Sequence, residues 1–134
     1  MGLDISHDAF SGAYSAFNRF RGFIAKGTGG SFPPHDDESL DRNCWYFGEG
    51  YNKTKHPGLW ELLCHSDCDG KITPGKCNKL ANELEELMPK LLELAENDDG
   101  GGHISRDGGY IEVTKRFIAG CRLAAERKES LRFR

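Results

Sequence analysis

Apolar residues recur at helical spacing from about residue 8 to residue 26. They are Phe10, Ala13, Phe17, Phe20 and Ile24. Residues three or four apart share one side of an α-helix, so the pattern predicts a helix over 8–26 with this side buried. Gly12 and Gly22 weaken that helix by up to about 1 kcal/mol each.

Three later segments also have helical patterns. A short helix is expected at 57–64, where a proline occupies the first position. The strongest pattern starts after Thr73, and Pro89 lies inside it, so we expect a kink or a break there. The last helix is expected at about 110–127. The residues expected to face inward in the last two helices are Cys77, Leu80, Ala81, Leu84, Leu87, Met88, Leu91, Tyr110, Val113, Phe117, Cys121 and Ala124.

These patterns predict a mostly α-helical fold, a compact bundle of about four helices in one domain over 1–134. The alternation in Leu131–Phe133 indicates a strand, which would make the fold α+β with a short strand pair. The segment 27–57 holds glycines, two prolines and an acidic run, and it predicts a long loop rather than a helix. Its aromatic cluster at 45–47 indicates that the second half of the loop packs, with a short strand as one alternative.

The loop at 65–73 copies an EF-hand in shape. With Gly70 at the sixth position, Asp67 and Asp69 fall on ligand positions three and five. Ile72 falls on position eight, where we expect an inward apolar side chain, and helices are predicted on both sides. The segment therefore predicts an EF-hand-like helix–loop–helix.

The ligand chemistry of this loop fails at both ends. His65 stands at the first position and Lys76 at the twelfth, where a glutamate should supply two oxygens. Asp67 and Asp69 are thus weak metal candidates, and we expect no metal and no cofactor. Zinc is also disfavoured, because the cysteine spacing is not that of a zinc knuckle and Cys77 falls on an apolar helix face.

Composition narrows the function classes. The net charge of −3, with 18 basic residues spread along the chain, argues against binding of duplex nucleic acid. Five cysteines without a signal peptide indicate reduced thiols in a cytosol. No apolar run approaches the ~18 residues that span a membrane.

A polar edge adjoins the apolar side of the first predicted helix. His7, Tyr14 and Arg21 follow one another at intervals of seven residues, and Ser11 lies on the same edge. One interpretation is a pocket wall, since an arginine fork suits phosphate and a tyrosine stacks on a ring. The alternative is a polar rim around the core, with Arg21 reaching water.

A second candidate cluster precedes and enters the last helix. Gly100–Gly102 and His103 precede Tyr110 and Arg116, and glycines beside a helix start bring backbone N–H groups close to an anion. The alternative is a flexible loop. For catalysis, His7, His65 or His103 offers a general base, but no nucleophile motif accompanies them.

Four stretches are familiar in combination. They are MGLDISH with GAYSAF and the arginines after it, HSDCDG, GGGHI and TKRFIAGCR. In this order they resemble a family of small uncharacterised proteins of tailed phages and prophages. No catalytic residue carries over from that family. The resemblance implies expression in a bacterial cytosol and action on host machinery or host immunity, for example by sequestering a nucleotide signal of a defence system.

The leading hypothesis is therefore a non-enzymatic protein that binds a small phosphorylated or nucleotide-like molecule. Its pocket would lie between the first and last helices. A rival is a protein-interaction module that inhibits a host protein through Trp45, Tyr46 and Tyr51, because aromatic anchors are common hot spots. A third hypothesis is a hydrolase of a small substrate. A homo-oligomer is compatible with sequestration.

Overall fold

The computed structural model describes residues 2–30, 47–64, 70–98, 100–106 and 108–134, without the side chain of His103. The helices are α1 (Tyr14–Gly27), α3 (Pro57–Cys64), α4 (Pro74–Ala95), α5 (Gly102–Arg106) and α6 (Tyr110–Glu126). The strands are β1 (Gly2–Ile5), β2 (Phe10–Ala13), β3 (Lys71–Ile72) and β4 (Leu131–Arg132). The fold is thus mostly α with short antiparallel strand pairs, as the sequence predicts.

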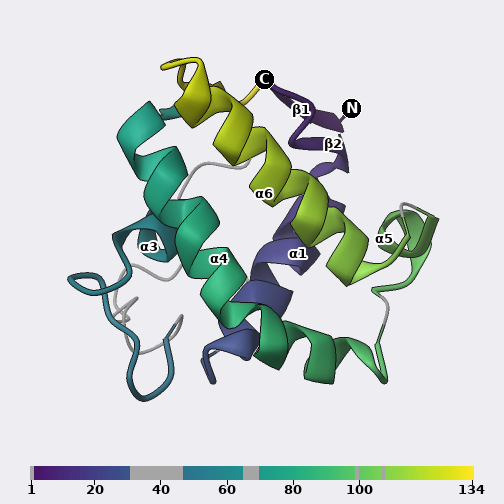
Figure 1. Cartoon of the computed structure of the whole chain (residues 1–134). Helices are drawn as coiled ribbons and strands as arrows, with labels where there is room; N and C mark the ends of the chain where they lie inside the picture. Colours follow the sequence, from purple (N-terminus) through teal and green to yellow (C-terminus); the bar gives the residue numbers. More distant parts are fainter. Residues whose placement is uncertain (1, 31–46, 65–69, 99, 107) are drawn as a thin grey trace, which may run out of the picture.

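The helices pack around α4. It contacts α6, α3 and α1, and α4 and α6 lie side by side in Figure 1 with α1 behind them. The helix runs unbroken past Pro89, so the predicted break is absent. Its inward face follows the predicted pattern, with Leu80, Leu84 and Leu87 buried.

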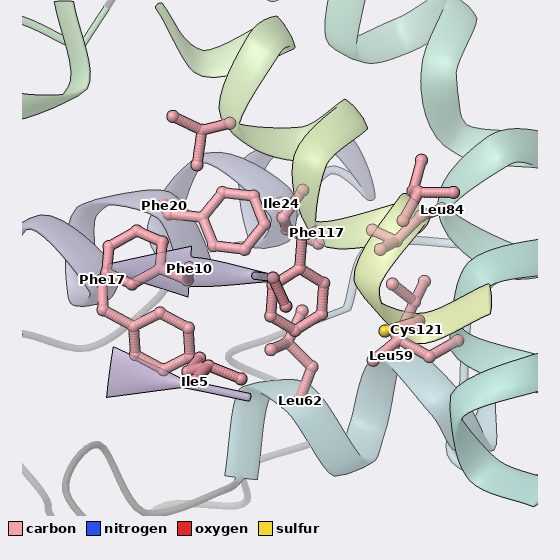
Figure 2. Packing of buried hydrophobic residues seen from close by; sticks show 14 of the residues in the cluster. Ile5, Phe10, Phe17, Phe20, Ile24, Leu59, Leu62, Leu84, Phe117 and Cys121 are labelled. Atoms are coloured by element: carbon pink, nitrogen blue, oxygen red, sulfur yellow. The ribbon is translucent and has the colours of Figure 1, made fainter. Parts of the chain in front are cut away.

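Aromatic rings fill the centre of the core. Phe17, Phe20 and Ile24 of α1 are fully buried, which confirms the predicted stripe. The Phe20 ring meets Phe117 of α6 with centroids 5.4 Å apart, and the Phe17 ring meets Phe10 at 5.2 Å (Figure 2). Such offset and edge contacts stabilise the packing beyond the burial of area alone.

The first helix begins later than predicted. Residues 10–13 form β2, which pairs with β1 in the register Ile5↔Phe10, and α1 starts only at Tyr14. Leu3, Ile5 and Phe10 are all buried. Alternate residues of a strand share a face, so a hairpin buries these side chains as well as a helix does. Phe10 therefore packs beside the apolar side of α1 although it belongs to β2. Its spacing from Phe17 fits a helix, and for this reason the predicted helix began too early.

The C-terminal segment joins the two strand pairs. Asp4 and Arg134 exchange both backbone hydrogen bonds, at 2.8 and 3.0 Å, and Ile5 forms a bridge with Phe133. On its other side β4 pairs with β3 through Ile72↔Leu131, which confirms the strand predicted near Leu131. The spatial order is β2, β1, β4, β3, and the two chain ends lie close together in Figure 1.

This strand arrangement has an apolar and a polar face. The inner face consists of Leu3, Ile5, Phe10, Ile72, Leu131 and Phe133, all buried. The exposed residues between them are Asp4, Lys71, Arg132 and Arg134. Ile72 is fully buried, as expected for position eight of the EF-hand-like loop, and α3 and α4 flank that loop.

Glu83 of α4 caps the start of α3. Its carboxylate oxygens accept hydrogen bonds from the backbone N–H groups of Gly58 and Leu59, at 3.0 and 3.1 Å. Unpaired N–H groups at a helix start need such acceptors. Burial raises the pKa of the Glu83 carboxyl above its ordinary value of 4.5, and the two backbone hydrogen bonds partly oppose this rise.

The end of the long loop packs on the same region. Phe47 is buried, forms a bridge with Gly29, and its ring lies 5.9 Å from that of Trp60. Phe47 of the predicted aromatic cluster therefore packs on the core. Trp45 and Tyr46 lie outside the described residues.

Two glycines permit close backbone approaches. A Cβ on Gly120 of α6 would lie 2.4 Å from the Cβ of Ala9 in the hairpin turn. A Cβ on Gly58 would lie 2.5 Å from the Cα of Leu80. Since neither neighbour is the end of a flexible side chain, the helices reach these distances because the residues are glycines.

We predict that Gly120→Ala destabilises the protein by about 1–3 kcal/mol, because the added methyl group forces α6 away from the hairpin. Urea denaturation followed by circular dichroism measures this. Gly75→Ala is the matched control, because nothing lies within 4 Å of its added Cβ. Equal stability of the two variants would contradict the close approach.

We predict that Glu83 makes stability fall as pH rises from 4.5 through the higher folded-state pKa of this carboxyl. In that window the folded state keeps a proton that the unfolded state has lost. Glu83→Gln should remove this part of the pH dependence of the unfolding free energy, whereas Glu93→Gln, exposed on the same helix, should keep it. Parallel pH profiles for wild type and Glu83→Gln would disprove the assignment.

Candidate functional site

The predicted polar edge of the first helix is not one surface in the structure. His7 lies in the turn of the β1–β2 hairpin, and Ser11 is exposed on β2. Tyr14 is half-buried at the start of α1. Since helical periodicity does not run through a hairpin, the seven-residue spacing no longer aligns these side chains.

Arg21 is part of the core. It is only 5% exposed, and its guanidinium donates hydrogen bonds to the Leu62 carbonyl and the Asn18 side chain. The same group lies 4.9 Å from the centre of the Phe17 ring, a cation–π contact. Arg21 therefore holds the end of α3 against α1 and does not reach water.

The second predicted cluster is brought together only in part. The Tyr110 ring stacks on Phe23 with centroids 4.1 Å apart and planes at 2°. Gly100 and Gly101 have positive φ and precede α5, Gly102 begins that helix, and a Cβ on Gly100 would lie 3.1 Å from Tyr110 Cζ. His103 lies in α5.

Arg116 of α6 clamps the hairpin turn instead. Its Nε donates to the Asp8 carbonyl at 2.8 Å, and its Nη2 pairs with the Asp8 carboxylate at 2.6 Å. His7 and Asp8 have φ values of 60° and 58°, a region that residues other than glycine rarely adopt. The clamp holds a strained turn in place, and strained backbone is common at functional sites.

A polar cleft opens beside this turn, where the hairpin meets the chain after α6. Its volume is about 460 Å³. The lining residues are Ser6, His7, Lys128, Glu129, Ser130, Arg132 and Arg134. Of the predicted ligand-binding residues whose side chains the structure describes, only His7 lines it.

A chain of hydrogen bonds crosses the cleft. The backbone N–H of Arg132 donates to Ser6 Oγ at 2.8 Å, and Ser6 Oγ lies 2.8 Å from His7 Nδ1. On the other side of the ring, His7 Nε2 lies 3.1 Å from the Glu129 carboxylate. If Nε2 carries the proton, Nδ1 accepts from the Ser6 hydroxyl, and the chain is consistent throughout.

Positive charge gathers around this chain. The side chains of Lys128, Arg132 and Arg134 form no ion pair within the part of the chain that the structure describes. A second hollow of about 470 Å³ adjoins the first, shares Arg132 and Arg134, and adds Lys71. The polar outer face of the strands thus carries Lys71, Arg132 and Arg134 together with the acidic residue Asp4.

No group of three metal-ligating side chains occurs among the described residues. Asp67 and Asp69 of the EF-hand-like loop, and His65, lie outside them. Cys77 of α4 packs as a small buried residue against Cys121 of α6, as its place on the apolar face predicts. The hydrogen bond between the two thiols and burial raise the pKa of the Cys121 thiol, while the same hydrogen bond lowers the pKa of the Cys77 thiol.

Tyr51 is the one residue of the predicted partner surface that the structure describes. Its ring is half-buried, 4.6 Å from the ring of His56 and 4.9 Å from the Lys90 ammonium. It thus packs between His56 and Lys90 of α4. Within the described ranges, no helix is long and apolar enough to cross a membrane.

No family model, no curated protein and no solved structure matches this chain.

The cleft was missed in the sequence because its residues come from both ends of the chain. The available signal was the alternation in residues 131–134, which places Arg132 and Arg134 on one side of a strand. Nothing in the local sequence indicated that residues 131–134 pair with the segment around Asp4 and Ser6.

We predict that Arg21→Ala lowers the unfolding free energy by about 2 kcal/mol, because hydrogen bonds from a buried charged group are lost. Arg19→Ala, exposed on the same helix, should change it by less than about 0.5 kcal/mol. Thermal and urea unfolding measure both. A stable Arg21→Ala variant that failed to bind a phosphorylated ligand would instead restore Arg21 to the binding site.

Proposed function

We propose that this chain binds a small phosphorylated or nucleotide-like molecule in the cleft between the hairpin turn and the C-terminal segment. The observation that carries the proposal is the group of three cationic side chains, Lys128, Arg132 and Arg134, around one hollow beside His7. None of them is neutralised by a carboxylate of the described chain.

The chemistry of these groups suits phosphate. Arginine donates two parallel hydrogen bonds to a phosphate, and lysine adds a point charge. Ser6 and Ser130 add hydroxyl groups to the same lining. The volume of about 460 Å³ lies within the range of small-molecule sites.

Glu129 opposes an anion, since it is the one carboxylate side chain among the lining residues. It faces His7, and its side chain is 54% exposed, so water weakens its repulsion of a ligand held by the arginines. The balance of three cationic side chains against one carboxylate still favours an anion.

The wider setting in this proposal comes from the phage resemblance. A small protein made in the bacterial cytosol would hold a nucleotide signal and keep it from a defence system. Binding without turnover suffices for that role, and a host-protein inhibitor stays the alternative.

We predict that inorganic phosphate and ATP bind with measurable heat at low salt, while uncharged adenosine does not. Arg134→Glu should raise the ATP dissociation constant by about tenfold or more, because a charge-assisted hydrogen bond is replaced by repulsion. Isothermal titration calorimetry measures these constants.

Lys79→Glu is the control, because it makes the same charge change on α4 at an exposed position outside the cleft. It should leave the dissociation constant within about twofold of wild type, since a distant exposed charge is screened. Equal weakening by both substitutions would show a non-specific charge effect. No binding of either anion would disprove the proposal.

A further inference from the structure

We propose that Ser6 is an activated nucleophile, with His7 as its general base and Glu129 as the residue that positions His7. Ser6 Oγ lies 2.8 Å from His7 Nδ1, and His7 Nε2 lies 3.1 Å from Glu129 Oε1. A nucleophile within hydrogen-bond reach of a base, which a third group orients, is the arrangement that serine hydrolases share. The cleft therefore carries an acyl-transfer site.

Burial and access favour this assignment. The His7 side chain is only 10% exposed, so its ring is held in place, while Ser6, His7 and Glu129 all line the open cleft. The positive φ of His7 turns its ring back onto the preceding Ser6. The Arg116 clamp on Asp8 fixes the same turn from the other side.

The reaction is the hydrolysis of a carboxylic ester. Ser6 Oγ bonds to the carbonyl carbon and passes its proton to His7 Nδ1, while Nε2–H stays hydrogen-bonded to Glu129. The ester C–O bond breaks, and the leaving alkoxide takes the proton from His7. Water then attacks the acyl-serine, His7 accepts one of its protons, and the proton returns to Ser6 Oγ as the acid leaves. The sum is ester plus water to acid plus alcohol.

The substrate class follows from the lining. An ester with a negative group beside the reacting carbonyl would place that group on Arg132 and Arg134. This choice of an anionic ester rests on the proposed anion site. The nucleophile itself does not, because an uncharged reagent tests it separately.

The test is labelling of the full chain with an uncharged alkyl fluorophosphonate, followed by intact-mass and peptide mass spectrometry. Ser6 Oγ forms a bond to phosphorus, fluoride leaves, and His7 takes the proton. We expect one adduct per chain, on Ser6. His7→Asn should slow labelling by about 100-fold or more, as loss of a general base does.

Two features make these variants informative. Asparagine tolerates positive φ, so His7→Asn keeps the hairpin turn, which circular dichroism and the melting temperature verify. Ser11→Ala removes an exposed hydroxyl of β2 outside the cleft and should label at the wild-type rate. No adduct, or an adduct on Ser6 that forms equally fast in His7→Asn, would overturn the proposal.

Steady-state hydrolysis of mono-p-nitrophenyl succinate separates the roles. Glu129→Gln should lower kcat by about tenfold or more with KM little changed, because it acts through His7. Arg134→Glu should raise KM for this anion about tenfold more than it raises KM for uncharged p-nitrophenyl acetate, because only the anion loses an attractive charge. Labelling of Ser6 without the KM effect would mean that the nucleophile stands and the anion site fails. Binding of the anion without any labelling of Ser6 would retain the anion site and reject the nucleophile.

Discussion

The backbone pairing of the C-terminal segment between β1 and β3 is the interaction on which the rest of the structure depends. It inserts Leu131 and Phe133 into the core, where the Phe133 ring meets Phe17 with centroids 5.7 Å apart. By the alternation of a strand, the same pairing leaves Arg132 and Arg134 on the outer face. One strand thus closes the core over α1 and builds the cationic wall of the cleft.

The hairpin turn depends on that pairing. His7 and Asp8 both adopt positive φ, which costs free energy in residues with a side chain. Contacts from α6 and from the segment after it hold the turn, through Arg116 on Asp8 and Glu129 on His7. A two-residue turn of glycine and asparagine would need no such support. The chain therefore keeps His7 and Asp8 at positions where a turn of glycine and asparagine would cost less free energy.

Most of the fold was predictable because it is local. The apolar faces of α1, α4 and α6, the inward Ile72 and the strand near Leu131 all follow from spacing within one segment. The hairpin was not predictable in this way, since the position of Phe10 fits the apolar pattern of a strand as well as that of a helix. Among the described members of the predicted ligand-binding set, only His7 lines the cleft. Ser11, Tyr14 and Arg21 were placed on one edge because a continuous helix from residue 8 was assumed. Contacts between elements far apart in the sequence have no periodic signature. Such contacts place Arg21 against Leu62 and Tyr110 against Phe23.

The position of Glu129 bears on whether the cleft only binds or also reacts. A hydrogen bond from the His7 ring to Glu129, whose side chain is 54% exposed, adds only about 1 kcal/mol or less to stability. Arg116 already clamps the turn, so stability alone gives Glu129 little to add. Its carboxylate also weakens the attraction of the cleft for an anion. A group that costs binding and adds little stability is best explained by what it does to His7, which is to fix the ring with Nδ1 toward Ser6.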